Sequence, residues 1–71
     1  MEGLTEGQIV HFIVEGLHRP AVVTHVWSKE SGTINLYVFP DGSYPLDNFT
    51  PTSVTFDENA RNSTWHWIEK A

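Results

Sequence analysis

The sequence predicts an all-β domain, folded as a small five-stranded barrel or as a rolled antiparallel sheet. Residues that favour strands dominate, with seven Val, four Ile, seven Thr, four Phe, three Trp and two Tyr among 71 residues, because branched and flat side chains pack well on a pleated surface. No stretch of about 12 residues has helical apolar spacing without Gly or Pro inside it. Turn residues recur at the short intervals typical of small barrels. We expect one domain, residues 1–71.

Gly and Pro mark where the first three expected strands begin and end. Gly7 precedes the first strand, and Pro20 opens the second after a turn over residues 15–19. Polar residues 29–32 form the next turn. Pro40-Asp41-Gly42-Ser43 is a strong turn signal, because Pro presets φ and Gly supplies a positive φ. These signals predict strands over residues 8–14, 21–28 and 33–39.

The rest of the chain predicts less regular structure. Residues 44–51 contain two prolines, so we expect them to be irregular. Residues 57–62 are polar and predict a loop or one helical turn. A short fourth strand is expected over residues 52–56 and a fifth over residues 63–69.

Side chains alternate between two faces along each strand, and the first hairpin is apolar on both. The opposite face from the expected core contains two histidines and a tryptophan: Ile9, His11, Ile13, Ala21, Val23, His25 and Trp27. A turn centred on Leu17 and His18 places His11 opposite or diagonal to His25, although a slip of one residue reverses the faces. We expect these residues to be mostly buried: Val10, Phe12, Val22, Val26, Leu36 and Val38.

A chain of 71 residues cannot easily cover two apolar faces by itself. One interpretation is a tightly curled barrel whose strand ends contribute to both sides. The other is a partner, most simply a second copy, which predicts a homo-oligomer. In that case aromatic residues lie at a subunit contact or line a pocket beside one: Trp27, Tyr37, Phe39, Trp65 or Trp67.

Charge and composition exclude several classes of function. The chain has no cysteine, which removes disulfides and thiolate zinc sites. A net charge of −5 argues against non-specific binding to nucleic acid or to anionic lipid. No apolar run approaches the roughly 18 residues of a membrane span, and the acidic residues at positions 2 and 6 do not fit a signal segment. We expect a soluble intracellular protein.

The motif order over residues 7–43 resembles that of SH3-like barrels of the Tudor type. The residues that carry it are Arg19-Pro20-Ala21-Val22-Val23 after the first turn and a strand from Ile34 that ends at Asp41-Gly42. The resemblance implies a five-stranded SH3-like barrel.

Most of the chain also resembles a group of small uncharacterised tailed-bacteriophage proteins. The most specific stretches are Arg19-Pro20-Ala21 and Trp65-His66-Trp67, which members of the group continue with Pro where this chain has Ile68. The resemblance implies a phage accessory protein in the cytoplasm of an infected bacterial host. It supplies no activity and no catalytic residues.

The histidines are the candidates for metal chemistry: His11, His18, His25 and His66. Two cross-strand imidazoles can converge on zinc or nickel. No HxH, HxxxH or HExxH spacing supports such a site, and half-buried strand histidines account for the same pattern, so we expect no metal and no cofactor. The chain has no cysteine nucleophile, Gly-x-Ser-x-Gly elbow or phosphate-binding glycine loop. We therefore expect no catalytic residues and no enzymatic activity.

Aromatic and polar side chains supply the candidate binding residues: Trp27, Tyr37, Phe39, Trp65, Trp67, His18, Arg19 and His66. Such rings form cages for cations, stack on bases, or pack in cores and interfaces. A nucleotide pocket at a subunit interface would combine Arg19 with His18 or His66 and a tryptophan.

The resulting hypothesis is a non-enzymatic binding or assembly module that contacts a host protein or defence system through an acidic surface. The alternative is an oligomer that sequesters a host nucleotide-type immune signal in an interface pocket. A small enzyme is the third hypothesis. Converging Arg, His and Trp side chains would favour sequestration, whereas a smooth acidic face would favour the protein partner.

Overall fold

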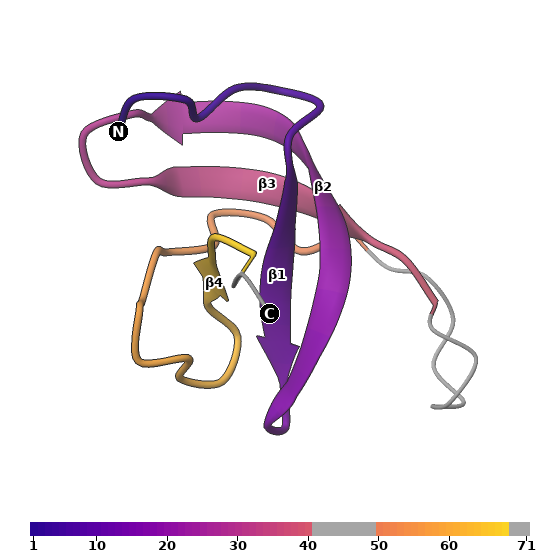
Figure 1. Cartoon of the computed structure of the whole chain (residues 1–71). Coiled ribbons are helices and arrows are strands. Elements are labelled where there is room, and N and C mark those ends of the chain that lie inside the picture. The colour runs from indigo at the N-terminus through magenta and orange to yellow at the C-terminus, as the bar shows by residue number, and fades with distance from the viewer. Residues whose placement is uncertain (41–49, 69–71) are drawn as a thin grey trace.

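A computed structural model describes residues 1–40 and 50–68 of the chain. The all-β prediction is confirmed: four strands form one antiparallel sheet in the order β3-β2-β1-β4, and no helix occurs in the described residues (Figure 1). The strands are β1 (Ile9–Val14), β2 (Leu17–Ser28), β3 (Thr33–Val38) and β4 (Trp65–His66). The sheet is not closed, and the predicted five strands and SH3-like barrel are not confirmed.

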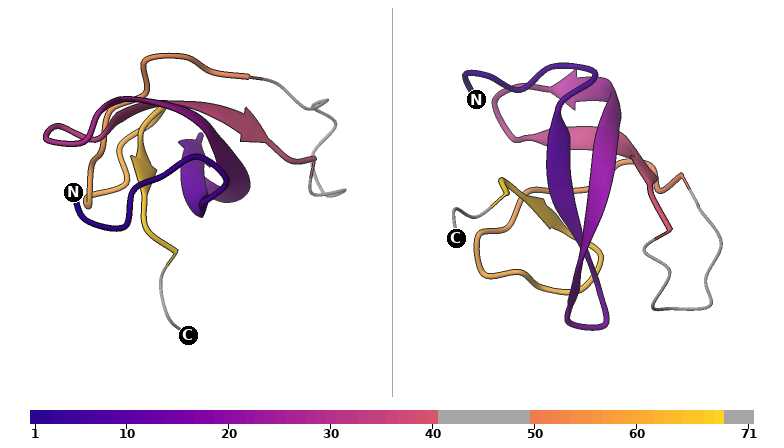
Figure 2. Two further views of the ribbon diagram at one scale, coloured as in Figure 1. Left: turned by 90° about the horizontal axis from the view of Figure 1, so that it is seen from above. Right: turned by 45° about the vertical axis from the view of Figure 1, so that its right-hand side comes forward.

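The long strand β2 gives the sheet its shape. Its first half pairs with β1 and its second half with β3. Register shifts between Val23 and His25 and between Val26 and Ser28 interrupt the second ladder, and such bulges bend a strand. Figure 1 shows β2 rising beside β1 and then curving to run along β3. The chain after residue 50 runs along β3, where Ile34 and Val54 exchange backbone hydrogen bonds, and then returns to β4 (Figure 2).

The first hairpin is tighter than predicted. Glu15 and Gly16 have φ values of 49° and 82°, as in the two-residue type I′ turn that matches the twist of paired strands. Val14 therefore pairs with Leu17. The turn predicted over residues 15–19 is wrong, because β2 already begins at Leu17.

This turn also corrects the predicted register. His11 pairs with Pro20 and not with His25, which lies opposite Asn35 of β3. The two registers differ by an odd number of residues, and an odd shift exchanges the faces of a strand. Accordingly, Ala21 and Val23 are buried where Val22 had been expected in the core.

In β1 and β3, the core lies on the face that was predicted from the alternation of apolar residues. Val10, Phe12, Leu36 and Val38 are buried as expected, whereas Val22 and Val26 are only half-buried. Among the described residues, the buried core cluster consists of Leu4, Val10, Phe12, Ala21, Val23, Ile34, Leu36, Val38, Val54 and Trp65.

The last part of the chain has less strand than predicted. In place of a fourth strand over residues 52–56, Val54 and Phe56 form isolated bridges to Ile34 and Trp65. Of the strand predicted over residues 63–69, the described part up to residue 68 contains only the two residues of β4. Residues 58 and 59 form a turn, in agreement with the predicted loop. The predicted Pro40-Asp41-Gly42-Ser43 turn and irregular segment 44–51 lie largely outside the described residues.

Candidate functional site

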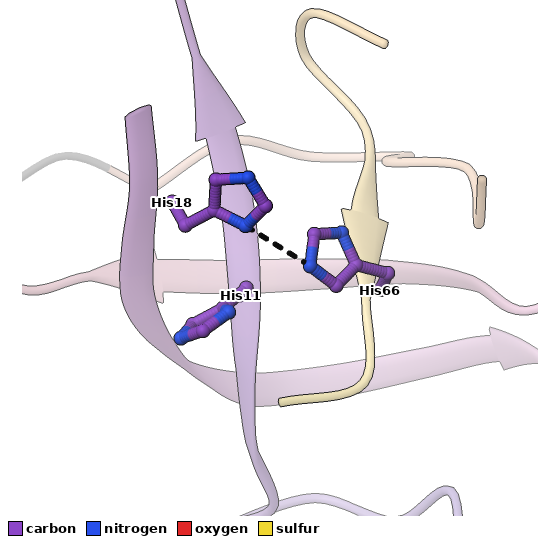
Figure 3. A group of neighbouring side chains, drawn as sticks. All are labelled: His11, His18 and His66. Atoms are coloured by element: carbon purple, nitrogen blue, oxygen red, sulfur yellow. Dashed lines mark hydrogen bonds between the residues drawn. The ribbon is translucent and has the colours of Figure 1, made fainter. Parts of the chain in front are cut away.

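Three histidines from three strands meet on one face of the sheet. His11 of β1 lies directly opposite His66 of β4, and Ile13 of β1 lies opposite His18 of β2. Residues that face each other across a ladder share a face, as do residues two apart on a strand. His11, His18 and His66 therefore project together, as Figure 3 shows.

The three imidazoles are in mutual contact. Nδ1 of His18 lies 3.2 Å from Nε2 of His66, so one ring donates an N–H to the lone pair of the other. The ring of His11 stands edge-on to both, with centroids 5.6 Å from His18 and 5.5 Å from His66. His66 is buried, His11 is half-buried and His18 is exposed. We call these three residues the imidazole cluster.

Two members of the imidazole cluster border a pocket. His18, His66 and Trp67 line a hollow of about 360 Å³, together with Phe56, Glu58, Ala60 and Ile68. A larger hollow of about 510 Å³ lies near the tip of the first hairpin, and Glu15 is the one ionisable side chain in its described lining. The smaller hollow is therefore the better candidate site, because it brings two imidazoles, a carboxylate and an indole together.

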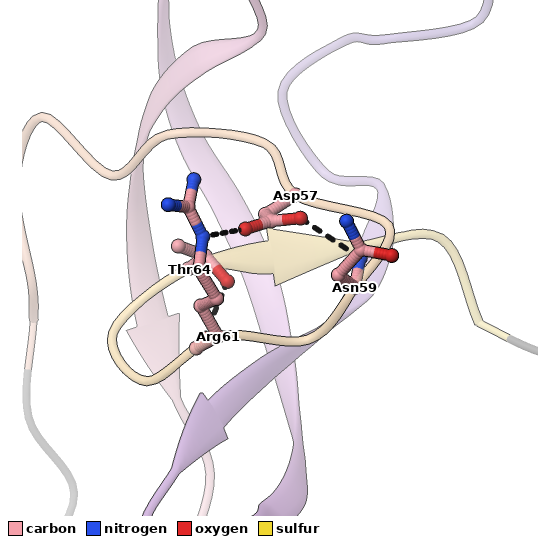
Figure 4. Close-up of polar contacts among 4 residues, drawn as sticks. All are labelled: Asp57, Asn59, Arg61 and Thr64. Carbon is pink, nitrogen blue, oxygen red and sulfur yellow. Dashed lines mark hydrogen bonds and ion pairs between the residues drawn. The ribbon is translucent and has the colours of Figure 1, made fainter.

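A network of polar contacts holds the loop that forms one wall of this pocket (Figure 4). Oδ1 of Asp57 accepts a hydrogen bond of 2.8 Å from the Asn59 backbone N–H, and Oδ2 pairs with Nε of Arg61. These two donors, the Asn59 N–H first, hold the pKa of Asp57 below its usual range. Thr64 closes the loop by donating to the carbonyl of Arg61 at 2.6 Å. The loop thereby positions β4 beside β1, so that His66 lies against His11 and His18.

The tryptophans of the terminal motif occupy different environments. Trp65 is fully buried in the core. Its ring stands edge-on between Phe56 and Trp67, with centroid separations of 5.0 and 5.1 Å. Trp67 is half-buried and lines the pocket. The buried ring of Trp65 therefore supports the indole of Trp67, which is the one available to a ligand.

The other predicted binding residues lie apart from the pocket. Arg19 is buried on the core face opposite Phe12, and its Nη2 donates to the Phe39 carbonyl at 2.7 Å. Phe39 itself contacts Tyr37, with ring centroids 5.3 Å apart. Trp27 is 60% exposed and donates to Asn35 through its indole N–H. The predicted subunit contact through these rings stays a prediction.

Residue type identifies the four histidines as candidates, but it does not show which three of them converge. The one local signal was Gly16: a two-residue turn that ends at this glycine places His11 and His18 on one face, although Glu15 is not typical of such a turn. His66 could not have been added in this way, since its pairing with β1 joins residues far apart in sequence.

Comparison with protein-family models, curated proteins and solved structures found no match to this chain. Over residues 1–40 and 50–68, no helix is long and apolar enough to cross a membrane.

Proposed function

We propose that the protein is a non-enzymatic module that binds a small, flat, polar molecule in the pocket lined by His18, His66 and Trp67. The observation that carries the proposal is the convergence of two imidazoles and an indole on one hollow. The indole offers a face on which a heterocycle stacks, and the imidazoles offer hydrogen-bond donors and acceptors at its edge.

The size and charge of the pocket narrow the class of ligand. A volume of about 360 Å³ lies at the lower end of the range for small-molecule sites and fits a nucleoside better than a dinucleotide. Glu58 lies in the lining, and the guanidinium of Arg19 is buried elsewhere. A net charge of −5 also disfavours a polyphosphate. We therefore propose a nucleobase-containing ligand with little negative charge, which the protein binds without converting it.

Titration with a panel of nucleosides and nucleoside monophosphates, followed by calorimetry and by amide chemical shifts, tests this proposal. Stacking on one aromatic ring is worth about 1–3 kcal/mol, so Trp67→Leu should weaken binding roughly 10- to 100-fold. Trp27→Leu is the matched control, because Trp27 lies outside the pocket lining, and it should bind as the wild type does. A panel without any binder, or equal binding by Trp67→Leu, would refute the proposed pocket.

Contact with a protein partner is the second candidate function, and the exposure of Trp27 favours it. Its ring is 60% exposed and lies 4.3 Å from that of His25, centroid to centroid. A large exposed ring of this kind is typical of an interface anchor. The partner is either a host protein or a second copy of this chain. Sedimentation velocity separates the two, because concentration-dependent self-association abolished by Trp27→Ser identifies a second copy.

A further inference from the structure

We propose that His11, His18 and His66 bind one divalent transition-metal ion, with Zn²⁺ as the best fit. This site needs only the imidazole cluster and therefore goes beyond the small-ligand pocket proposed above. Each of the three residues offers one ligand nitrogen, and these nitrogens all lie within 4.8 Å of one another.

The spacing of the nitrogens suits a zinc ion. Zn–N bonds are about 2.0–2.1 Å long, so two nitrogens on a tetrahedral ion lie roughly 3.3 Å apart. Nδ1 of His18 and Nε2 of His66 are already 3.2 Å apart. The third nitrogen lies within 4.8 Å of the other two, so it has to approach them by at most roughly 1.5 Å to complete the triangle. His18 is exposed and His11 half-buried, so their side chains have room to adjust around the buried His66.

The ligand set selects the class of metal. Three neutral imidazoles suit zinc, copper, nickel and cobalt, whereas Ca²⁺ and Mg²⁺ require oxygen ligands. Three protein ligands also leave the fourth position of a tetrahedral ion to water or to a bound molecule. Since His18 and His66 border the pocket, the ion would lie at the pocket wall. The nearby carboxylate of Glu58 and the net negative charge of the chain favour a cation there.

The ion would also strengthen the attachment of β4, which is the shortest strand, to the sheet. The ligands come from β1, β2 and β4, and β4 pairs with β1 through only two residue pairs. A metal that binds the folded protein and not the unfolded chain raises the melting temperature. Zinc binding can therefore be measured as a rise in melting temperature, without any small ligand present.

The test uses the full chain with any affinity tag removed, since a histidine tag would bind the metal itself. Calorimetric titration with Zn²⁺ should show one ion per chain, and Mg²⁺ should give no heat. Because loss of a supporting residue already costs 10- to 100-fold in metal affinity, His18→Gln should weaken Zn²⁺ binding at least about 100-fold. His18 is exposed, so this variant should stay folded, and circular dichroism checks that it does. His25→Gln is the matched control and should bind Zn²⁺ as the wild type does.

A second pair of variants separates the metal from the small ligand. His11 belongs to the imidazole cluster but not to the described pocket lining, whereas Trp67 lines the pocket and is not a metal ligand. His11→Gln should therefore lose Zn²⁺ binding, and Trp67→Leu should keep it. Failure of the nucleoside titration leaves the metal proposal standing. The metal proposal is wrong if wild-type protein takes up no Zn²⁺, or if His11→Gln and His18→Gln bind it unchanged. In either case the imidazoles only pack against one another.

Discussion

Trp65 and Gly32, 33 positions apart in sequence, are joined in the protein interior by a hydrogen bond of 2.6 Å from the indole N–H to the backbone carbonyl. Gly32 lies in the turn between β2 and β3, and Trp65 opens β4. The bond therefore ties the two-residue strand β4, which carries His66, to the opposite end of the sheet. The imidazole cluster depends on this attachment, because the ladder between β1 and β4 is only two residue pairs long.

Trp65→Phe should destabilise the protein by about 2–4 kcal/mol. The change leaves the buried Gly32 carbonyl without its indole donor and removes part of a fully buried ring. Urea unfolding followed by circular dichroism measures the loss. Trp27→Phe removes an indole hydrogen bond on the surface and should cost less than about 1 kcal/mol. Equal losses of unfolding free energy in the two variants would show that the buried hydrogen bond contributes no more to stability than the surface one.

Gly32→Ala should cost at least about 1–2 kcal/mol, because Gly32 has a φ of 77° that other residues adopt with strain. An added Cβ would also lie 2.8 Å from the Met1 side chain and 3.0 Å from Cβ of Phe56. Gly3 is the control: its φ is 81°, but nothing lies within 4 Å of an added Cβ. Gly3→Ala therefore isolates the backbone cost, and Gly32→Ala should melt at the lower temperature in a thermal scan. A higher melting temperature for Gly32→Ala than for Gly3→Ala would contradict this packing.

Alternation predicted the faces of single strands well. Ile34, Leu36 and Val38 of β3 are all buried, because the period of two is a property of any strand. The register between β1 and β2, by contrast, is set by the turn that joins them. Glu15-Gly16 closes the hairpin with two residues of positive φ, and Glu is not a residue that signals this conformation.

The residues of the candidate site could be predicted from the sequence, but their convergence in space could not. His18, His66 and Trp67 were named from residue type, but their convergence depends on the pairing of β1 with β4 and on the loop around Asp57. A two-residue strand has too short a pattern to be distinguished from a loop by periodicity. Arg19 was predicted to line a nucleotide pocket at a subunit interface, whereas its side chain is buried and it pairs with Phe12 on the core face.

Leu36→Ala should cost about 2–5 kcal/mol, because it opens a cavity in the centre of the core. A domain of this size has roughly 3–5 kcal/mol of stability, so the variant should be largely unfolded at 37 °C. Leu17→Ala makes the same chemical change at a side chain that is 40% exposed and should cost under about 1 kcal/mol. Thermal melts of the pair check the expectation, and a Leu36→Ala variant that melts within a few degrees of wild type would contradict the assigned face of β3.

Acid should destabilise the fold through Asp57. The Asn59 backbone N–H and the Arg61 guanidinium lower its folded-state pKa, so the unfolded chain binds the proton more readily. A carboxylate of this kind contributes stability above its unfolded pKa and loses it as the pH falls through the folded pKa. Asp57→Asn should therefore lower the melting temperature at pH 7 and flatten its dependence on pH below about 5. Glu2→Gln, at an exposed position near the N-terminus, is the control and should retain the wild-type slope.

Glu15→Asn should stabilise the protein by about 0.5–1 kcal/mol, because Glu15 holds a φ of 49° that Asn adopts more readily. The Asn-Gly pair that results is the preferred sequence of a type I′ turn. The backbone N–H of Glu15 donates to Oδ1 of Asn62 at 2.9 Å, and the substitution preserves this bond because it changes only the side chain. Glu15→Val is the matched contrast: a branched side chain is disfavoured at positive φ, so it should destabilise by at least about 1 kcal/mol. Urea midpoints of the two variants should fall on opposite sides of wild type. The reverse order would mean that the hairpin is not closed by Glu15 and Gly16, and the shared face of His11 and His18 would then lose its basis.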